Sequence, residues 1–259
     1  MRFARSAAAI GFILVATALP AAAADWTVST GVMAGIGPAY EGANRYKANA
    51  LPLIDVEWRE RLFLSTERGL GGWVYKRDGI SLGAALGYEM GRDADLDRSE
   101  LAGLGDVKGA AQARFLAGYR AGPMRFDATV ARALGGSDGT TVKLGAGMGY
   151  PVNDKFRLMP GASIVWADST YMSSYFGVTG AQAAASRSLL GAAAAKSQYS
   201  ASAGIKNVDL SLMGMYQLSS NWALRGGGGV RFLVGDAADS PISKRDTAPF
   251  GMLGLVYRW

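Results

Sequence analysis

Alternation of apolar with small or polar side chains is the feature that most constrains the fold of this chain. From Ile80 to Glu89 every second residue is apolar or aromatic, and the pattern recurs from Met124 to Ala131 and from Thr141 to Tyr150. Successive side chains of a β-strand leave opposite faces of the sheet, so this period predicts strands. The segments run to about ten residues, which is the length that a tilted strand needs to cross a bilayer.

The connections between the predicted strands differ in length in a regular way. We expect about twelve strands, near 26–34, 47–58, 61–67, 71–76, 79–89, 109–120, 123–133, 141–150, 155–166, 207–217, 222–234 and 247–259. Tight turns occupy every second connection, at 59–60, 76–79, 120–123, 151–154 and 219–221, and most other connections are longer. This arrangement is typical of outer-membrane barrels. We therefore predict an all-β fold: a single antiparallel transmembrane β-barrel with short periplasmic turns and long external loops.

The two faces of the predicted strands carry different side chains. The apolar face is aromatic near the tight turns, as expected of a girdle at the membrane interface: Trp26, Trp58, Tyr75, Tyr119, Tyr150, Phe156, Tyr216, Trp222, Tyr257 and Trp259. The opposite face should line the lumen and is charged: Asp55, Glu57, Arg114, Arg125, Asp127, Lys143, Arg157, Asp209, Arg225, Arg231 and Arg258. A soluble exported β-sandwich also alternates, but it has no need of an aromatic ring at one edge of its apolar face.

The first 24 residues have the pattern of a secretory signal peptide. Arg2 and Arg5 precede an apolar stretch from Ala7 to Leu19, and a small-residue site ends at Ala24. The stretch is shorter than the roughly 20 residues of a spanning helix. We expect residues 1–24 to be a cleaved signal and residues 25–259 to form one barrel domain in the outer membrane of a Gram-negative cell.

Several segments resemble the hallmark blocks of the MipA/OmpV family of outer-membrane proteins. They are Gly37–Gly42, Leu51–Asp55, Arg61–Ser65, Gly91–Asp93, Tyr171–Thr179 and Gly235–Ile242, in the order found in the family and spread over the chain after the signal. The motif residues without an assigned role are Pro38, Tyr40, Glu41, Gly42, Arg92, Tyr171, Phe176, Gly177, Asp236, Asp239, Ser240 and Pro241. The namesake is similar to a scaffold that links a lytic transglycosylase to a penicillin-binding protein.

The resemblance implies a scaffold that interacts with a periplasmic murein hydrolase and synthase. A narrow outer-membrane channel, or a surface adhesin or receptor acting through the external loops, are the alternatives. The chain ends Leu253-Gly254-Leu255-Val256-Tyr257-Arg258-Trp259. The terminal aromatic residues Tyr257 and Trp259 resemble the signal that the barrel-assembly machinery recognises, and outer-membrane lipid surrounds the barrel.

The composition argues against catalysis. The chain contains no histidine and no cysteine, which removes the usual general base and any thiol chemistry. Asp93, Asp95 and Asp97 have the spacing of the start of a calcium loop, but Arg98 stands where that loop needs glycine. We expect no catalytic residue, no cofactor and no metal site. A net charge of +6 without a basic cluster or a nucleic-acid motif also argues against nucleic-acid binding.

Two further expectations concern the loops and the lumen. Residues 181–196 should form a short helix in the longest loop, and the aromatic residues that begin this loop, Tyr171, Tyr175 and Phe176, either form an exposed binding patch or pack the loop onto the barrel rim. In the lumen, Arg114, Arg125, Asp127 and Arg157 are expected to pair across the barrel and to keep conductance low.

Overall fold

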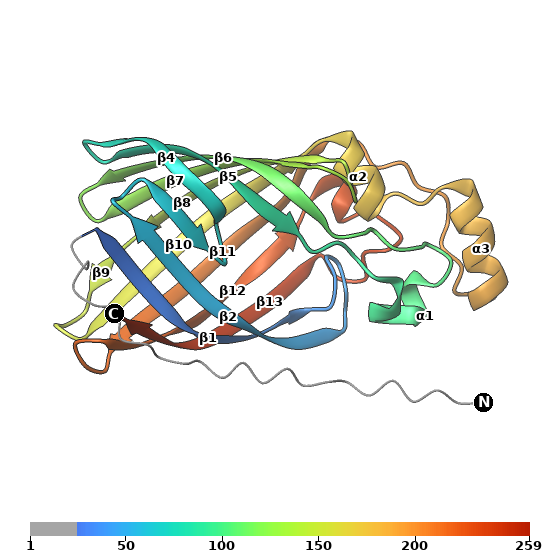
Figure 1. Cartoon of the computed structure of the whole chain (residues 1–259). Coiled ribbons are helices and arrows are strands. Elements are labelled where there is room, and N and C mark those ends of the chain that lie inside the picture. Colours follow the sequence, from blue (N-terminus) through green and yellow to red (C-terminus); the bar gives the residue numbers. More distant parts are fainter. Residues whose placement is uncertain (1–24) are drawn as a thin grey trace, which may run out of the picture.

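The strands of the computed structural model close into an antiparallel β-barrel (Figure 1). The structure describes residues 25–259, so the predicted signal peptide lies outside the described residues. The first strand pairs with the last, from Ser29 opposite Arg258 to Ile36 opposite Gly251, which closes the ring. The prediction of a twelve-stranded barrel is confirmed, and the β-sandwich alternative is wrong.

Each strand pairs with its neighbours in chain order. The segments are β1 (Trp26–Pro38), β2 (Tyr46–Trp58), β3 (Leu62–Ser65), β4 (Gly69–Arg77), β5 (Ile80–Glu89), β6 (Ala110–Ala121), β7 (Met124–Ala133), β8 (Thr140–Met148), β9 (Tyr150–Pro151), β10 (Phe156–Ala167), β11 (Gly204–Gln217), β12 (Trp222–Leu233) and β13 (Thr247–Arg258). Because β8 and the two-residue β9 both pair with β10, they occupy one position in the ring, and thirteen segments make twelve strands.

The two ends of the barrel differ, as the connection lengths predict. At the turn end, Arg59 and Glu60 have φ values of 50° and 53°, and Asp78 and Gly79 have values of 53° and 79°. Positive φ at both central residues matches the right-handed twist of the flanking strands and makes a tight hairpin. The C-terminus lies at this end, and the helices of the loops gather at the opposite loop end (Figure 1).

The loops carry all the helices of the described chain. They are η1 (Ala94–Asp97), α1 (Arg98–Leu101), α2 (Ser169–Phe176), α3 (Gly180–Leu190) and η2 (Gly235–Ala237). The predicted helix within residues 181–196 is confirmed as α3, and Thr179 and Gln182 form a capping box at its N-terminus. Within residues 25–259, no helix is long and apolar enough to cross a membrane.

The outer surface of the barrel is apolar and ends in an aromatic belt at the turn end. Large side chains of the outward phase are exposed, for example Val32 at 56% and Leu253 at 57%. Aromatic rings of neighbouring strands lie in contact along the belt, in the pairs Trp26–Trp58, Tyr119–Phe126, Phe156–Tyr216, Trp222–Tyr257 and Tyr257–Trp259. A surface of this kind is suited to hydrocarbon with interfacial rings, and it places the barrel in a membrane.

Two local departures from the expected strands have physical reasons. β1 continues beyond Ala34 to Pro38 because β2 pairs with it over its full length, up to Pro38 opposite Tyr46. β3 is shorter than predicted and ends at Ser65, because the next residue, Thr66, bonds through its hydroxyl to Pro52 of β2, whereas β4 is longer than predicted and runs from Gly69 to Arg77. The mid-strand glycines of β12 do mark a close approach: a Cβ atom on Gly227 would lie 2.2 Å from the carbonyl oxygen of Leu212.

Candidate functional site

A cluster of buried loop residues, here called the cap, closes the loop end of the barrel. It has two adjoining parts. One contains Tyr171, Met172, Tyr175, Phe176, Ala201, Leu233 and Ala237, and the other contains Tyr40, Ala43, Leu101, Leu104, Val178 and Ile242. Tyr199 packs against both parts. Loops that are far apart in the sequence therefore share one apolar core outside the barrel wall.

The residues of the family motifs meet in this cap, although they come from separate loops. Arg92 donates from Nη1 to the carbonyl oxygen of Tyr175 at 2.6 Å. Ser240 donates from Oγ to the carbonyl oxygen of Phe176 at 2.6 Å, and the Tyr40 hydroxyl donates to the carbonyl oxygen of Ile242 at 3.2 Å. These bonds satisfy carbonyl groups that loops leave unpaired, so the motif side chains hold the loops against one another.

Two motif glycines allow close contacts that a side chain would block. Gly42 has a φ of +92°, and a Cβ atom there would lie 2.6 Å from Oγ of Ser243. A Cβ atom on Gly177, after the end of α2, would lie 2.5 Å from the carbonyl oxygen of Ser173.

The remaining motif residues lie at the edge of the cap. Asp236 accepts a hydrogen bond from the backbone nitrogen of Ser202 at 2.6 Å. Asp239 is exposed, whereas Pro38 ends β1 and Pro241 lies half-buried beside Ile242. The motifs thus contribute mainly packing and backbone support.

The aromatic residues at the start of the longest loop pack inside the cap and do not form an exposed patch. They belong to α2, which sequence patterning did not predict. Asp168 accepts from the backbone nitrogen of Tyr171 at 2.8 Å and begins the helix, and Phe176 is fully buried. The rings of Tyr171 and Tyr175 stack with centroids 4.5 Å apart. The packing alternative is therefore confirmed and the exposed-patch alternative is wrong.

A network of charged groups joins the cap to the barrel wall. Glu41, in the loop between β1 and β2, lies 2.5 Å from Nζ of Lys206 and 3.1 Å from Nη1 of Arg231. Arg231 also pairs with Asp209 at 2.9 Å, and the Tyr171 hydroxyl donates to Glu41 at 3.3 Å. Burial alone would raise the pKa of Glu41, but the two cations outweigh it and hold this pKa below its ordinary value.

Other ion pairs tie the peripheral loops together. Asp97 is buried and lies 3.5 Å from Nε of Arg45, which links the loop after β5 to the loop after β1. Glu100 of α1 pairs with Lys196 and, at 3.1 Å, with Lys244. Of the three aspartates that begin like a calcium loop, Asp95 pairs with Arg98 at 2.7 Å and Asp97 with Arg45, whereas Asp93 accepts from the backbone nitrogen of Asp95 at 2.8 Å.

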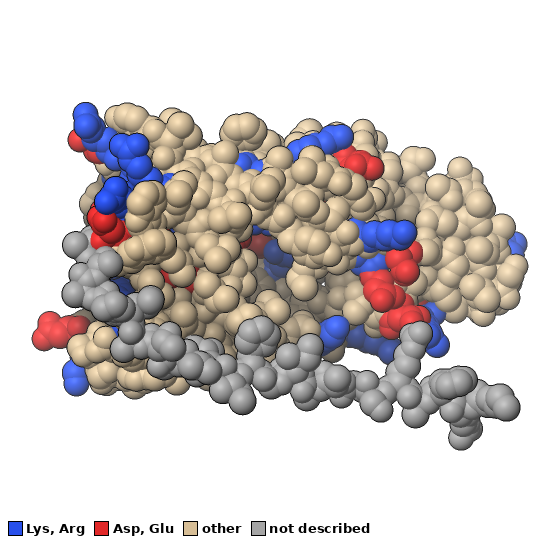
Figure 2. Space-filling view, viewed as in Figure 1, with Lys and Arg blue, Asp and Glu red and all other residues tan. Residues whose placement is uncertain are grey.

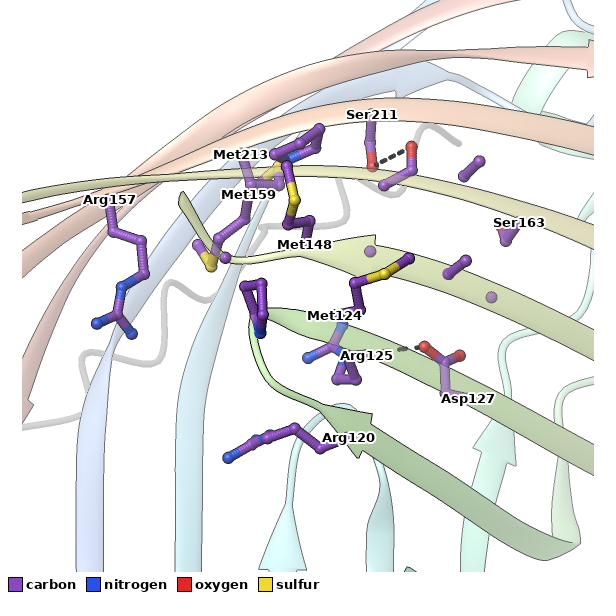
Figure 3. Close-up of a pocket in the computed structure, with 18 of the residues that line it drawn as sticks. Arg120, Met124, Arg125, Asp127, Met148, Arg157, Met159, Ser163, Ser211 and Met213 are labelled. Atoms are coloured by element: carbon purple, nitrogen blue, oxygen red, sulfur yellow. Dashed lines mark hydrogen bonds and ion pairs between the residues drawn. The ribbon is translucent and has the colours of Figure 1, made fainter. Parts of the chain in front are cut away.

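Below the cap, the turn-end half of the lumen is a basic cavity of about 480 Å³ (Figure 3). Five basic side chains line it, Arg120, Arg125, Lys143, Arg157 and Arg225, against one acidic side chain, Asp127. Among residues 25–259, Nε of Arg225 is shielded from solvent and has no hydrogen-bond partner. Positive charge gathered in a concave wall attracts anions.

The expected pairing of charges across the lumen is wrong for most of the residues named. Arg125 and Asp127 do pair, at 3.8 Å, but both lie on β7. Arg114 on β6 donates to the carbonyl oxygens of Glu67 and Tyr88 and to the side chain of Gln112. These charged side chains therefore find their partners along the wall, on the same strand or on neighbouring segments. The cap, and not ion pairing, closes the barrel.

A second cavity of about 390 Å³ lies between the basic cavity and the cap. Tyr171 and Lys206 line it from the side of the cap, and Glu67, Arg68, Tyr88 and Glu89 line it at β3, β4 and β5. Asp127 and Lys143 line both cavities, so the two adjoin.

The last strand brings its terminal aromatic residues to the closing seam of the barrel. Tyr257 lies opposite Thr30 of β1 and opposite Trp222 of β12. The backbone nitrogen of Trp259 donates to the carbonyl oxygen of Val28 at 3.1 Å, and its indole nitrogen donates to Oγ1 of Thr30 at 3.2 Å. Both residues that the sequence analysis singled out for assembly therefore sit where the ring closes.

A closed barrel with an apolar exterior, an aromatic belt and a capped loop end defines an outer-membrane β-barrel protein. The family is identified by a sequence model described as MltA-interacting protein MipA, which matches residues 30–259. The chain belongs to the MipA family, and the predicted family resemblance is confirmed.

Solved structures with a similar fold have low sequence identity. OmpT of Vibrio cholerae is 9% identical with a TM-score of 0.41, over 91% of this chain and 97% of that one. A Pseudomonas aeruginosa FadL homologue is 11% identical with a TM-score of 0.40, over 91% and 90% of the two chains. A bacterial polysaccharide outer-membrane secretin is 9% identical with a TM-score of 0.41, over 90% and 98%. The search of curated proteins found no match.

Proposed function

We propose that this protein is a non-enzymatic scaffold of the outer membrane that binds a periplasmic murein-remodelling enzyme at the turn end of its barrel. The observation that carries the proposal is the contrast between the two ends. The loop end is filled by the cap, whereas the turn end opens into a basic cavity with Arg120 and Arg157 in its lining (Figure 3). Figure 2 shows basic side chains at the turn end, interspersed with acidic ones.

The family supports the choice of partner. The name of the matching family describes an interaction with MltA, and the resemblance described above implies a lytic transglycosylase as one partner. A periplasmic enzyme can reach only the periplasmic end of an outer-membrane barrel. Arg77 and Lys155 are exposed in two turns of that end, each beside an exposed aspartate, Asp78 and Asp154. A partner surface with charges of both signs can therefore be complementary to these turns, and Arg77 and Lys155 would bind its acidic groups.

The position of the motif residues removes a difficulty for the scaffold. The family motifs that meet in the cap lie in the external loops, where a periplasmic partner cannot reach them. Their engagement in the cap gives them a role in folding instead, and leaves the turn end free for binding.

The test is affinity capture of the full protein from a detergent-solubilised cell envelope. The wild type should retain a lytic transglycosylase, identified by mass spectrometry. The double variant R77E/K155E should lose it, because two favourable charges become repulsive. The matched control, K108E/R187E, carries the same change on exposed residues of the loop end and should retain the enzyme. Equal retention by both variants, or capture of no murein enzyme by the wild type, would reject the scaffold and leave the channel and adhesin readings.

A further inference from the structure

The barrel wall has an opening between β2 and β5, here called the window, because β3 is too short to fill it. β3 pairs with β2 only from Asp55 opposite Ser65 to Trp58 opposite Leu62. Towards the loop end, residues 46–53 of β2 pair with β1 alone. On the other side, β4 pairs with β5 no further than Leu70 opposite Leu86, so residues 87–89 have no strand partner there.

The β2 edge of the window is stabilised without a further strand, because a side chain bonds to part of its backbone. Thr66 closes its lower corner: the hydroxyl accepts from the nitrogen of Ile54 at 3.0 Å and donates to the carbonyl oxygen of Pro52 at 3.1 Å. Pro52 has no N–H group, which disfavours the addition of another strand. At its outer end the window is bounded by the loops that Arg45 and Asp97 join.

The window lies within the membrane-facing part of the wall. Trp58 belongs to the aromatic belt, and about ten residues of a tilted strand cross the hydrocarbon, so residues 46–53 of β2 face its far half. From Tyr46 to Pro52, the side chains that point to the lipid and those that point to the lumen are all exposed. Figure 2 shows a hollow in this face with both basic and acidic side chains in its depth. Unpaired backbone at membrane depth is tolerated where it lines a water-filled cavity. On the other side of the window, Glu67 of the β3–β4 turn and Tyr88 and Glu89 of β5 line the cavity of about 390 Å³.

The lumen wall that leads inward from the window is apolar. Leu51 and Leu53 of β2 lie opposite Met33 and Gly31 of β1. Their phase is opposite to that of exposed Val32, so they face the lumen. Met252 of β13 continues the same strip opposite Gly35. Leu51 remains 48% exposed, as expected beside an opening.

The facing lumen wall is charged and its turn-end part is basic, so the interior as a whole is amphipathic. The cavity behind the window carries charges of both signs, from Arg68, Arg114, Lys143 and Lys206 and from Glu67, Glu89 and Asp127. In the adjoining cavity below, Arg125, Arg157 and Arg225 outnumber the one acidic side chain, Asp127. A molecule with an apolar chain and an anionic head group matches this division of surfaces. The cap closes the loop end and the turn end faces the periplasm, so the window is the route by which such a molecule would pass directly between the lumen and the membrane.

We propose that the lumen binds a single-chain anionic amphiphile of the fatty-acid type, which exchanges with the membrane through the window. The apolar chain lies along the strip of β13, β1 and β2. The head group lies among the basic side chains of β6, β7, β8, β10 and β12. The head group would occupy the basic cavity that opens at the turn end, but Arg77 and Lys155, the residues changed in the test of the periplasmic partner, do not line that cavity, so the two proposals can fail separately.

The first test uses purified full-length protein in nonionic detergent, with dansylaminoundecanoic acid as the probe. We expect saturable fluorescence enhancement that laurate reverses. L51E and R125Q/K143Q should each weaken binding at least tenfold. The matched controls are L218E, since Leu218 is 51% exposed at the turn end, and R77Q/K155Q; both should bind like the wild type. Heat-modifiable migration checks the folding of each variant. Non-saturable binding, equal affinity for an uncharged analogue, or wild-type binding by both lumen variants would overturn the proposal.

A second measurement tests the window without a ligand and without a disruptive substitution. The chain has no cysteine, so single cysteines can be labelled with bimane in lipid nanodiscs. A label at L51C should be quenched by doxyl-labelled lipid nearly as strongly as one at lipid-facing V32C. A label at S211C, which lines the lower cavity, should not be quenched. Quenching at L51C no stronger than at S211C would mean that the window is closed to lipid and would reject lateral exchange.

Discussion

Glu41 lies 2.5 Å from Lys206, although 165 residues separate them in the chain. The pair joins the loop after β1 to the wall strand β11, and both side chains are largely buried. A buried charge that loses its partner is costly, whereas the intact pair fixes the position of the loop. We therefore expect this carboxylate to contribute strongly to the attachment of the cap to the barrel.

Replacing this carboxylate should loosen the cap and leave the barrel closed. E41Q leaves the Lys206 ammonium without its anion, which costs on the order of 3 kcal/mol. Amide hydrogen exchange should show protection of α2 falling by about 100-fold, while heat-modifiable migration persists. E67Q is the control, since Glu67 is exposed and forms no ion pair within residues 25–259. Unchanged protection in E41Q would mean that apolar packing alone holds the cap.

The same carboxylate predicts an acid-sensitive cap. Its pKa in the folded protein lies below the ordinary value of 4.5, because Lys206 and Arg231 more than offset its burial. A depressed pKa contributes stability above the ordinary value, and this contribution is lost as the pH falls through the folded value. Protection of α2, corrected for the intrinsic exchange rate, should therefore decline below about pH 4.5. E41Q should lack this step, and a step of equal size in both proteins would assign it to other groups.

The cap also predicts the electrical behaviour of the barrel. Pure wild-type protein in a planar bilayer should show little or no conductance. Phe176 is the largest fully buried side chain, and F176A should cost about 3–5 kcal/mol and open the cap more often. F115A removes the same ring from the lipid-facing surface, where Phe115 is 68% exposed, and should conduct like the wild type. Large, steady current steps from the wild-type protein would favour the channel function over the scaffold function.

The closing seam predicts a role in assembly for the last three residues. Deleting Tyr257 to Trp259 removes the pairs with Thr30 and Trp222 and leaves the start of β1 without its partner at the membrane interface, where the closing seam begins. We expect export without insertion, followed by degradation in the periplasm, and loss of heat-modifiable migration. Y150A, which removes one exposed belt residue, should assemble normally. Normal outer-membrane levels of the truncated protein would show that closure tolerates a shortened seam.

Strand order and the two faces of each strand could be predicted, because they depend on local periodicity. The turns at Arg59-Glu60 and Asp78-Gly79 and the helix α3 follow from local chemistry in the same way. The ends of the strands depend on their partners and could not be predicted: β1 extends to Pro38 because β2 pairs with it that far.

The cap and the window could not be predicted, because they depend on contacts between distant segments. Arg92 and Ser240 both bond to carbonyl groups of α2, and no spacing in the sequence indicates this. The helix α2 itself could have been predicted from the sequence. Asp168 is a residue type that begins helices, and the apolar residues after it recur at helical spacing: Tyr171, Met172, Tyr175 and Phe176. The window follows from the early end of β3, which only the register reveals.

The orientation of the barrel decides whether the turn end can meet a periplasmic enzyme, and surface labelling tests it most directly. An epitope inserted at Ala193, in the exposed loop after α3, should be labelled by antibody on intact cells. Epitopes in the turns at Gly79 and Asn153 should be labelled only after the outer membrane is permeabilised. Labelling of the Gly79 epitope on sealed cells, with Ala193 protected, would contradict the orientation and with it the binding of a periplasmic partner.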